Sequence, residues 1–434
     1  MQFDSLKILV VGGGTWGLST CYHLALRGYK DITCLDKWSY PSLDSAGNDL
    51  NKMVRSEFVD DPVMQQLSQI AMHAWKTDPL FKIHFHETGR LSLANSSVNV
   101  PEILQLYQEL STSPHRDQVR WLDNAGEIKA LFPYLTGAMT GWKGVFNPEG
   151  GWVHARNAMK TVGDECVKMG VRFVLGTVNK LIYHANESKV IGVECVDGTQ
   201  WFADKIVLAC GAWIDTLIDM QGQLVAKTWT LAHIQVTDEE ERRKLKGTPV
   251  VFDVEKGFFF EPDHDTGMIK VCNEYPGFTN YQNIMADGKK KWISVPVQSS
   301  SIPTRSSREI HDLLLSLKPE WADIPLHNAR MCWCTDTADR HYLITLHPDY
   351  DGTLILASGA SGHGFKMLPV IGKYVADLVE GKRLQPHFQD AWRWRPEMNG
   401  SGRPADDSRP GKGGDLNDME QTGWKDKPKS SIEY

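Results

Sequence analysis

The sequence predicts an α/β protein in two parts, a parallel sheet of the dinucleotide-binding type and an antiparallel sheet lying over it. The apolar run 7–11 reads as a buried strand and leads at once into a glycine turn and an apolar helical stretch. The apolar strands 205–209 and 353–357 also end in glycine turns, although they lie far along the chain. Alternating strand patterns separated by turns, such as 257–260 and 268–271, occupy much of the sequence between them.

Composition narrows the class of protein. The chain has 434 residues, enough for two to four folding units at roughly 100–200 residues each. The chain has 47 Lys and Arg against 54 Asp and Glu, which gives a formal charge of −7. This net negative charge does not favour binding to nucleic acid or to an anionic membrane. Apolar runs such as 354–357 are too short to cross a bilayer. The eight scattered cysteines favour reduced thiols in an intracellular protein.

The first strand and turn carry a dinucleotide-binding fingerprint. Gly12, Gly14 and Gly17 fill its three glycine positions, which provide the tight turn, the close approach of backbone to pyrophosphate, and helix–strand packing. Asp36 ends the next strand, 19 residues after Gly17, where a carboxylate can accept from a ribose hydroxyl. Strand, helix, second strand and terminal acid agree, so we expect a dinucleotide site rather than an ordinary glycine-rich loop.

The dinucleotide-binding part is expected to be discontinuous. Strand–glycine-turn units spread over the whole chain predict one sheet assembled from separate segments. By fold analogy this favours a flavoprotein of the glutathione-reductase type over a nicotinamide dehydrogenase, which usually keeps this domain in one block. The expected segments are 1–80, 145–220 and 325–395 for the cofactor domain, 81–144 and 221–324 for the substrate domain, and 396–434 for a polar tail.

Several motifs together resemble one family. They are Ser45-Ala46-Gly47-Asn48-Asp49-Leu50-Asn51-Lys52, Gly257-Phe258-Phe259-Phe260-Glu261-Pro262-Asp263, Cys332-Trp333-Cys334-Thr335-Asp336-Thr337 and Ser361-Gly362-His363-Gly364-Phe365-Lys366. With the glycine turn, they resemble the fungal fructosyl amino acid and fructosyl peptide oxidases (amadoriases), and more distantly monomeric sarcosine oxidase and pipecolate oxidase. The resemblance covers almost the whole chain in the same order.

The resemblance implies a fold and a reaction. The fold would be a glutathione-reductase-type Rossmann FAD domain with an antiparallel substrate domain. The enzyme would use FAD and O2 to oxidise the C–N bond of fructosyl amino acids or short fructosyl peptides, giving glucosone, free amino acid or peptide, and H2O2. FAD would do the redox chemistry while the protein positions the reactants. The resemblance also implies a monomer.

Cys332 matches the cysteine that carries the flavin through a thioether at its 8-methyl group in this family. Cys334 fills the variable position of the matching Cys-x-x-Thr-x-Thr pattern, so Cys332 is preferred. The alternative is a buried cysteine that acts as a small hydrophobe. A metal site at the Cys-x-Cys pair is not expected, because no second cluster of ligands stands at a usable spacing.

Lys270 and Lys52 are the expected catalytic residues. By resemblance Lys270 rests over flavin N5, where a cation stabilises the superoxide formed when oxygen is first reduced. The alternative for Lys270 is a solvated charge at a sheet edge. Lys52 matches a second basic residue near the flavin ring.

Three residues are expected to bind substrate. Glu274 lies four residues after Lys270, hence on the same face of an extended strand, and its alternative is a surface glutamate. Lys366 matches a lysine that contacts substrate. Arg409 is the best match to the arginine that pairs with the substrate carboxylate, with Arg403 as competitor.

The residues expected to contact the cofactor share these motifs and turns. They are Gly12, Gly14, Thr15, Trp16, Gly17, Asp36, Ser45, Lys52, Val178, Gly211, Cys332, Gly362, Gly364, Phe365 and Lys366.

Two departures from the family leave alternatives open. The chain ends Ser431-Ile432-Glu433-Tyr434 rather than in a Ser-Lys-Leu-type peroxisomal address, so a cytoplasmic location is expected. Asn273 replaces an aspartate that is usual in the family, which leaves the substrate preference open. The alternatives are an oxidase of an unglycated secondary amine acid such as saccharopine or pipecolate, a flavin-binding protein without turnover, and a nicotinamide dehydrogenase.

Overall fold

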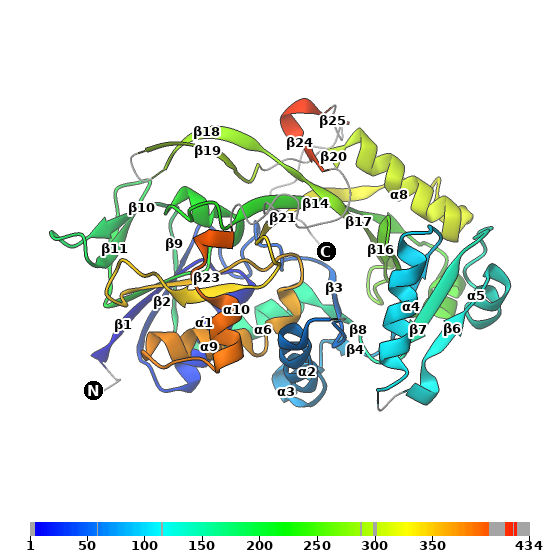
Figure 1. Cartoon of the computed structure of the whole chain (residues 1–434), viewed down its shortest axis with the longest axis horizontal. Helices are drawn as coiled ribbons and strands as arrows, with labels where there is room; N and C mark the ends of the chain where they lie inside the picture. Colours follow the sequence, from blue (N-terminus) through cyan, green and yellow to red (C-terminus); the bar gives the residue numbers. More distant parts are fainter. Residues whose placement is uncertain are drawn as a thin grey trace.

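Two large sheets organise the chain (Figure 1). The structure is a computed structural model that describes residues 5–58, 60–113, 116–286, 289–297, 302–398, 413–419 and 421–422. In Figure 1 the six-stranded sheet lies toward the labelled N-terminus, and β6, β7 and α5 lie at the opposite end of the molecule.

The six-stranded sheet is built from segments scattered over the sequence. Its strands, in spatial order, are β22 (Leu343–Leu346), β23 (Leu354–Ser358), β13 (Lys205–Leu208), β1 (Lys7–Val11), β2 (Asp31–Asp36) and β9 (Arg172–Leu175). All neighbouring pairs are parallel except β22–β23. The predicted discontinuous sheet around the N-terminal strand is therefore present.

Helices cover one face of this sheet. They are α1 (Thr15–Leu26), α2 (Pro62–Thr77), α3 (Pro79–Lys82), α6 (Ala155–Lys168), α9 (Ile371–Val379) and α10 (Pro386–Trp392), and their apolar residues share one core with β1 and β23. α1 and α9 pack so closely that a Cβ on Gly372 would lie 2.0 Å from the carbonyl oxygen of Ser19. Only glycine fits at this crossing, so the C-terminal third of the chain locks the first helix in place.

A three-stranded antiparallel sheet covers the opposite face. It consists of β10 (Val178–Tyr183), β11 (Val190–Cys195) and β12 (Gln200–Phe202), and it shares a second core with β1 and the 3-10 helix η3 (Gly211–Thr216). The parallel strands are buried on both faces, as their continuous apolar sequences predict.

The nine-stranded sheet carries the second half of the molecule. Its strands, in order, are β21 (His327–Asp336), β14 (Val225–Gln235), β17 (Met268–Thr279), β16 (Gly257–Phe259), β15 (Val250–Asp253), β5 (Arg90–Ala94), β7 (Lys143–Asn147) and β6 (Arg120–Leu122), with β24 (Gly414–Asp415) paired to β17. Its pairs are antiparallel except β15–β5 and β17–β24. The combination of a parallel sheet and a largely antiparallel sheet confirms the predicted fold class.

Helices and short sheets complete the second half. α5 (Ala125–Leu131), α7 (Glu239–Leu245) and α8 (Thr304–Leu317) pack on one core of the nine-stranded sheet, and α4 (Asn99–Leu110) packs on another with β5 and β7. The remaining pairings are β3 (Asn51–Val54) and β4 (Phe85–His86) on either side of β8 (Gly151–His154), β18 (Tyr281–Ala286) with β19 (Lys289–Ser294), and β20 (Ile302–Pro303) with β25 (Gln421–Thr422). The other 3-10 helices are η2 (Arg116–Gln118), η4 (Pro319–Trp321), η5 (Phe365–Met367), η6 (Pro396–Met398) and η8 (Leu416–Asp418).

The predicted domain boundaries remain predictions, although the sheets show where each strand pairs. β21, which the sequence assigned with 325–395 to the cofactor domain, pairs with β14 in the nine-stranded sheet. The described part of the tail returns to that same sheet, where Gly414 pairs with Phe278 and Asp415 with Thr279. Within the described ranges, no helix is long and apolar enough to cross a membrane.

Candidate active site

One large cavity runs between the six-stranded and the nine-stranded sheets. Its volume is about 710 Å³, within the range of small-molecule and cofactor sites. Every residue predicted to contact the cofactor lines it except Gly17, which is packed beneath the turn. Their individual roles stay predictions, but the fold brings them together from seven separate stretches of the chain.

The glycine turn at one end of the cavity can accept a dinucleotide. Gly12 has φ +108°, and a Cβ there would lie 2.5 Å from the carbonyl oxygen of Ala209. A Cβ on Gly17 would lie 1.7 Å from the carbonyl oxygen of Gly12. Gly14 occupies the N-cap of α1 and no side chain caps that helix, so its first amide groups are available to an anion. The residues present therefore fit a pyrophosphate at this turn.

Asp36 is fixed at the end of β2 next to the turn. Its carboxylate accepts hydrogen bonds from the amides of Gly13 at 2.7 Å and Trp38 at 2.8 Å, and from the Ser42 hydroxyl at 2.8 Å. Burial nevertheless raises the pKa of Asp36. The carboxylate lines the cavity, which is the position that the predicted contact with ribose requires.

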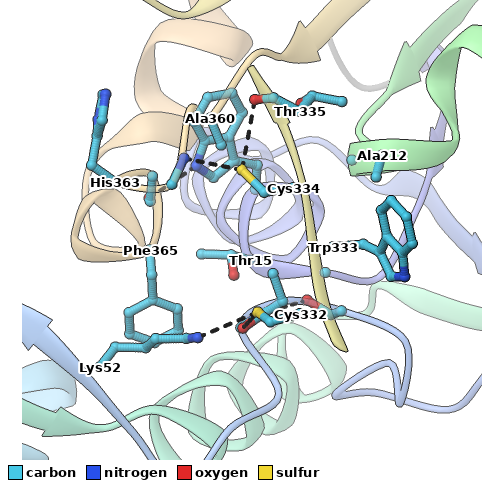
Figure 2. A pocket seen from close by; sticks show the side chains of 18 of the residues that line it. Thr15, Lys52, Ala212, Cys332, Trp333, Cys334, Thr335, Ala360, His363 and Phe365 are labelled. Carbon is cyan, nitrogen blue, oxygen red and sulfur yellow. Dashed lines mark hydrogen bonds between the residues drawn. The ribbon is translucent and has the colours of Figure 1, made fainter. Parts of the chain in front are cut away.

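Two cysteines on β21 point into the cavity at different places (Figure 2). Cys332 lies beside Lys52, whose Nζ is 3.7 Å from its Sγ. Cys334 lies toward His363 and accepts a hydrogen bond from the Gly362 amide at 3.0 Å. Cys332 is thus the cysteine that lies against a catalytic-site lysine, whereas Cys334 is held by the glycine-rich turn.

A buried aspartate that the sequence analysis did not single out holds both predicted catalytic lysines. Asp49 Oδ2 lies 2.5 Å from Lys270 Nζ and 2.7 Å from Lys52 Nζ. Lys270 also donates to the carbonyl oxygen of Asn51 at 2.9 Å. Both lysines line the cavity, so one carboxylate fixes two cations on the same wall.

The charges in this cluster follow from burial and proximity. Burial alone would raise the pKa of Asp49, but the ammonium groups of Lys270 and Lys52 hold it well below its usual range, so Asp49 is ionised. Lys270 is 1% exposed and lies in β17, which has β14 on one side and β16 on the other. The alternative of a solvated lysine at a sheet edge is therefore wrong.

A second pair of basic side chains, Arg55 and Lys366, also lines the cavity. Lys366, on η5, is buried, and its Nζ is 4.3 Å from the centre of the Phe58 ring. The Arg55 guanidinium is also 4.3 Å from that ring centre, and it donates to the carbonyl oxygen of Glu57. Burial, reinforced by the positive charge of Arg55, holds the pKa of Lys366 well below its usual value. A substrate carboxylate placed here would favour the protonated form of Lys366 beside the Arg55 guanidinium.

Two predicted substrate contacts cannot be compared with the structure. Glu274 belongs to β17, but its side chain is not among those described. Arg409 and its competitor Arg403 lie outside the described residues. Both assignments stay predictions.

Asp49 and Arg55 are the site residues that sequence reasoning missed. Asp49 stands within a motif quoted for the family resemblance, but its partner Lys270 is 221 residues away along the chain. Arg55 lies three residues after Lys52 and directly follows the end of β3. A charged residue close to a predicted catalytic lysine was the available signal in both cases.

The fold and cavity define a flavin-dependent oxidoreductase. The family model "DAO: FAD dependent oxidoreductase" matches residues 7–378, and the chain belongs to this family. FAD is therefore the dinucleotide, which settles the choice between flavin and nicotinamide.

Relatives with solved structures span nearly the whole chain. Fructosyl peptide oxidase from E. terrenum is similar with a TM-score of 0.89 and 40% identity, covering 98% of this chain and 99% of that one. The fructosamine oxidase of Aspergillus fumigatus (Amadoriase II) is similar with a TM-score of 0.87 and 38% identity, covering 98% and 99%. These likenesses confirm the resemblance to amadoriases drawn from the motifs.

A relative named for a different activity also matches nearly the whole chain. L-saccharopine oxidase of Schizosaccharomyces pombe is 32% identical over 418 residues, which is 92% of this chain and 95% of that protein.

Proposed function

We propose that this protein is an oxidase of fructosyl amino acids or short fructosyl peptides, whose C–N bond it oxidises with FAD and O2 to an imine that water then hydrolyses. The observation that carries the proposal is one cavity with the Asp49–Lys270–Lys52 cluster at its cofactor end and the Arg55–Lys366 pair beyond it. The fructosyl peptide oxidase likeness across 98% of the chain supports this choice of substrate. A monomeric state and a cytoplasmic location stay predictions of the sequence.

The residues that would hold FAD are the glycine turn, Asp36 and Cys332. The turn and the first amides of α1 would bind the pyrophosphate, Asp36 would accept from the ribose, and Cys332 would form the thioether. When bound, FAD would accept a hydride from the C–H bond next to the substrate nitrogen and pass the electrons to oxygen.

Arg55 and Lys366 bind and orient the substrate. Two basic side chains beside the Phe58 ring suit a carboxylate next to the secondary amine, and burial strengthens this contact because water is excluded. Lys366 Nζ takes up a proton when the carboxylate arrives, since the negative charge raises a pKa that burial had lowered.

Lys270 supplies a fixed positive charge where oxygen is reduced. Asp49 and the Asn51 carbonyl hold its ammonium in place before the reaction begins, so little reorganisation is needed when charge develops. Lys52 shares Asp49 and lies against Cys332, the proposed attachment point of the flavin.

An unglycated secondary amine acid is the second candidate substrate. The Arg55–Lys366 pair recognises a carboxylate and makes no demand for a sugar, and a relative named for saccharopine covers the same length of chain. The same cavity would then oxidise saccharopine or pipecolate.

Peroxide release across a substrate panel tests the proposal. The panel is fructosyl-valine, ε-fructosyl-lysine, fructosyl-valyl-histidine, saccharopine and pipecolate, assayed with the FAD-loaded enzyme. We expect the highest kcat/KM with a fructosyl compound. A preference for saccharopine or pipecolate would establish the second candidate, and peroxide from none of the five would refute both.

A further inference from the structure

A buried ion pair lies in the cavity wall and has no part in the chemistry described above. Glu57 Oε1 and Arg90 Nη2 are 2.7 Å apart, with side chains 8% and 6% exposed. Glu57 follows β3 and Arg90 begins β5, so the pair joins two segments of the chain in the cavity wall. Both residues line the same cavity as Lys366.

Several buried polar atoms of this pair lack a hydrogen-bond partner among the described residues. Neither carboxylate oxygen of Glu57 makes a hydrogen bond of normal geometry to any described residue, and Arg90 Nε makes none either. Buried polar atoms without partners cost free energy, and native proteins leave few of them. An acceptor carboxylate and a donor guanidinium, side by side in a cavity wall, are arranged to receive a ligand.

The chemistry of the two groups specifies that ligand. Glu57 accepts from an ammonium group, and the Arg90 fork donates to a carboxylate. A free α-amino acid carries both groups on one carbon atom. The Phe252 ring lies 5.8 Å from the Arg90 guanidinium, and Ile103 and Leu106 also line the cavity.

The position of the pair decides which part of a substrate it can bind. In an α-fructosyl amino acid, the α-amine is the nitrogen at the reacting bond, and Arg55 and Lys366 take the carboxylate beside it. Nothing is left for Glu57 and Arg90. In an Nε-substituted lysine, the reacting nitrogen lies at one end of an aliphatic stem and a complete α-amino acid lies at the other.

We infer that Glu57 and Arg90 form a distal subsite for the free α-amino acid end of an Nε-substituted lysine. The inference rests on the proposed function and deepens it, because it names lysine derivatives as the substrate class. Glu57 binds the α-ammonium, Arg90 binds the α-carboxylate, and the apolar side chains that line the cavity accommodate the methylene stem. Both ε-fructosyl-lysine and saccharopine have such an end.

Binding of a redox-inert probe tests the subsite separately from turnover. Nε-succinyl-L-lysine has a carboxylate for Arg55 and Lys366 and a free α-amino acid, but its amide nitrogen is not oxidised. We expect calorimetric titration of the FAD-loaded enzyme to show binding. Acetylation of the α-amine, or conversion of the α-carboxylate to an amide, should weaken binding at least about tenfold, the loss of one desolvated charge contact.

The variant Glu57→Gln tests whether Glu57 is the group that recognises the α-ammonium of the probe. In this variant the penalty for acetylating the α-amine should fall below about twofold, while the penalty for the carboxamide persists. Glu165→Gln makes the same change at a surface pair, 2.9 Å from Lys168, and should bind all three probes as the parent does.

The outcomes separate this inference from the proposed function. Equal binding of the three probes, no binding of any, or an acetylation penalty that survives in Glu57→Gln would overturn the subsite. The parent protein alone gives the first two results, so they hold even where the variant fails to fold. Peroxide release from the substrate panel is read independently, and its absence would refute the proposed function but not the subsite.

Discussion

Replacement of Asp49 by Asn tests the centre of the site most directly. The side chain keeps its size, but its negative charge is lost. Lys270 and Lys52, which lie 2.5 Å and 2.7 Å from one carboxylate oxygen, then face each other with no anion between them. We expect the protein to become less stable and Lys270 to lose the anion that holds its ammonium group in place.

The size of the effect follows from those distances. At an effective dielectric constant of about 20, each ion pair at 2.5–2.7 Å has a gross attraction of roughly 6–7 kcal/mol. Desolvation of three buried charges offsets much of this attraction. Removal of one partner of a buried pair typically costs about 3–5 kcal/mol, and we expect Asp49→Asn to fall in this range.

A surface pair of the same geometry provides the control. Lys143 Nζ and Asp123 Oδ1 are also 2.5 Å apart, but these side chains are 32% and 61% exposed. Asp123→Asn should therefore leave thermal unfolding, followed by circular dichroism, almost unchanged, while Asp49→Asn lowers the midpoint clearly. Solvent screening is the physical difference between the two sites.

The direction of the Asp49 pKa shift determines how its contribution to the stability of the fold varies with pH. The folded pKa of Asp49 lies below its unfolded value, so its contribution is complete above an unfolded pKa of about 3.9 and is lost as pH falls through the folded pKa. The difference in unfolding midpoint between parent and variant should thus be constant near neutral pH and shrink only in acid. Equal midpoints at neutral pH would refute the view that Asp49 balances the two lysines.

Three further predictions concern the cofactor, oxygen and substrate. Cys332→Ala should release the flavin into the supernatant on acid precipitation, whereas Cys334→Ala should retain it in the pellet; the reverse would move the attachment to Cys334. Lys270→Met should be reduced by substrate in anaerobic stopped flow about as fast as the parent, yet consume oxygen on the order of a hundred- to a thousand-fold more slowly, about 2.7–4 kcal/mol for one preorganised contact. Equal reoxidation rates would exclude that role. Binding of an anionic substrate should take up a proton at Lys366, so calorimetry in buffers of different ionisation enthalpy should detect uptake in the parent but not in Lys366→Met, and affinity should fall as pH rises through the Lys366 pKa of the complex; uptake that persists in Lys366→Met would contradict this assignment.

The cofactor end of the site could be predicted from sequence because its geometry is local. Gly12, Gly14 and Gly17 lie within one turn, and the backbone that each needs follows from the motif itself. The discontinuous sheet was predictable for the same reason, since each strand carries its own apolar run and glycine turn. Cys332 and Lys366 were predicted as site residues from the resemblance of their motifs to a family, and no periodic pattern indicated them.

The charge partners could not be predicted, because they depend on contacts between distant segments. Asp49 meets Lys270 only after β17 packs against the segment before β3, and nothing local to either residue signals the encounter. Glu57 and Arg90 are alike: each reads as an ordinary surface charge in the sequence, and only the fold buries them together. Sequence patterns indicate which residues are buried, but they do not indicate which buried charges meet.

The discontinuous six-stranded sheet has a consequence for biosynthesis. β1 and β2 leave the ribosome first, but β13, which covers the other edge of β1, begins only at Lys205, and β23 begins at Leu354. At roughly 5–20 residues per second, between about 20 and 70 seconds pass before Lys366 has been synthesised. Throughout this interval the nascent chain presents an apolar strand with an unpaired edge, the kind of surface that chaperones bind. Flavin loading is therefore a late event, since the nucleotide cradle closes only when the last third of the polypeptide has docked.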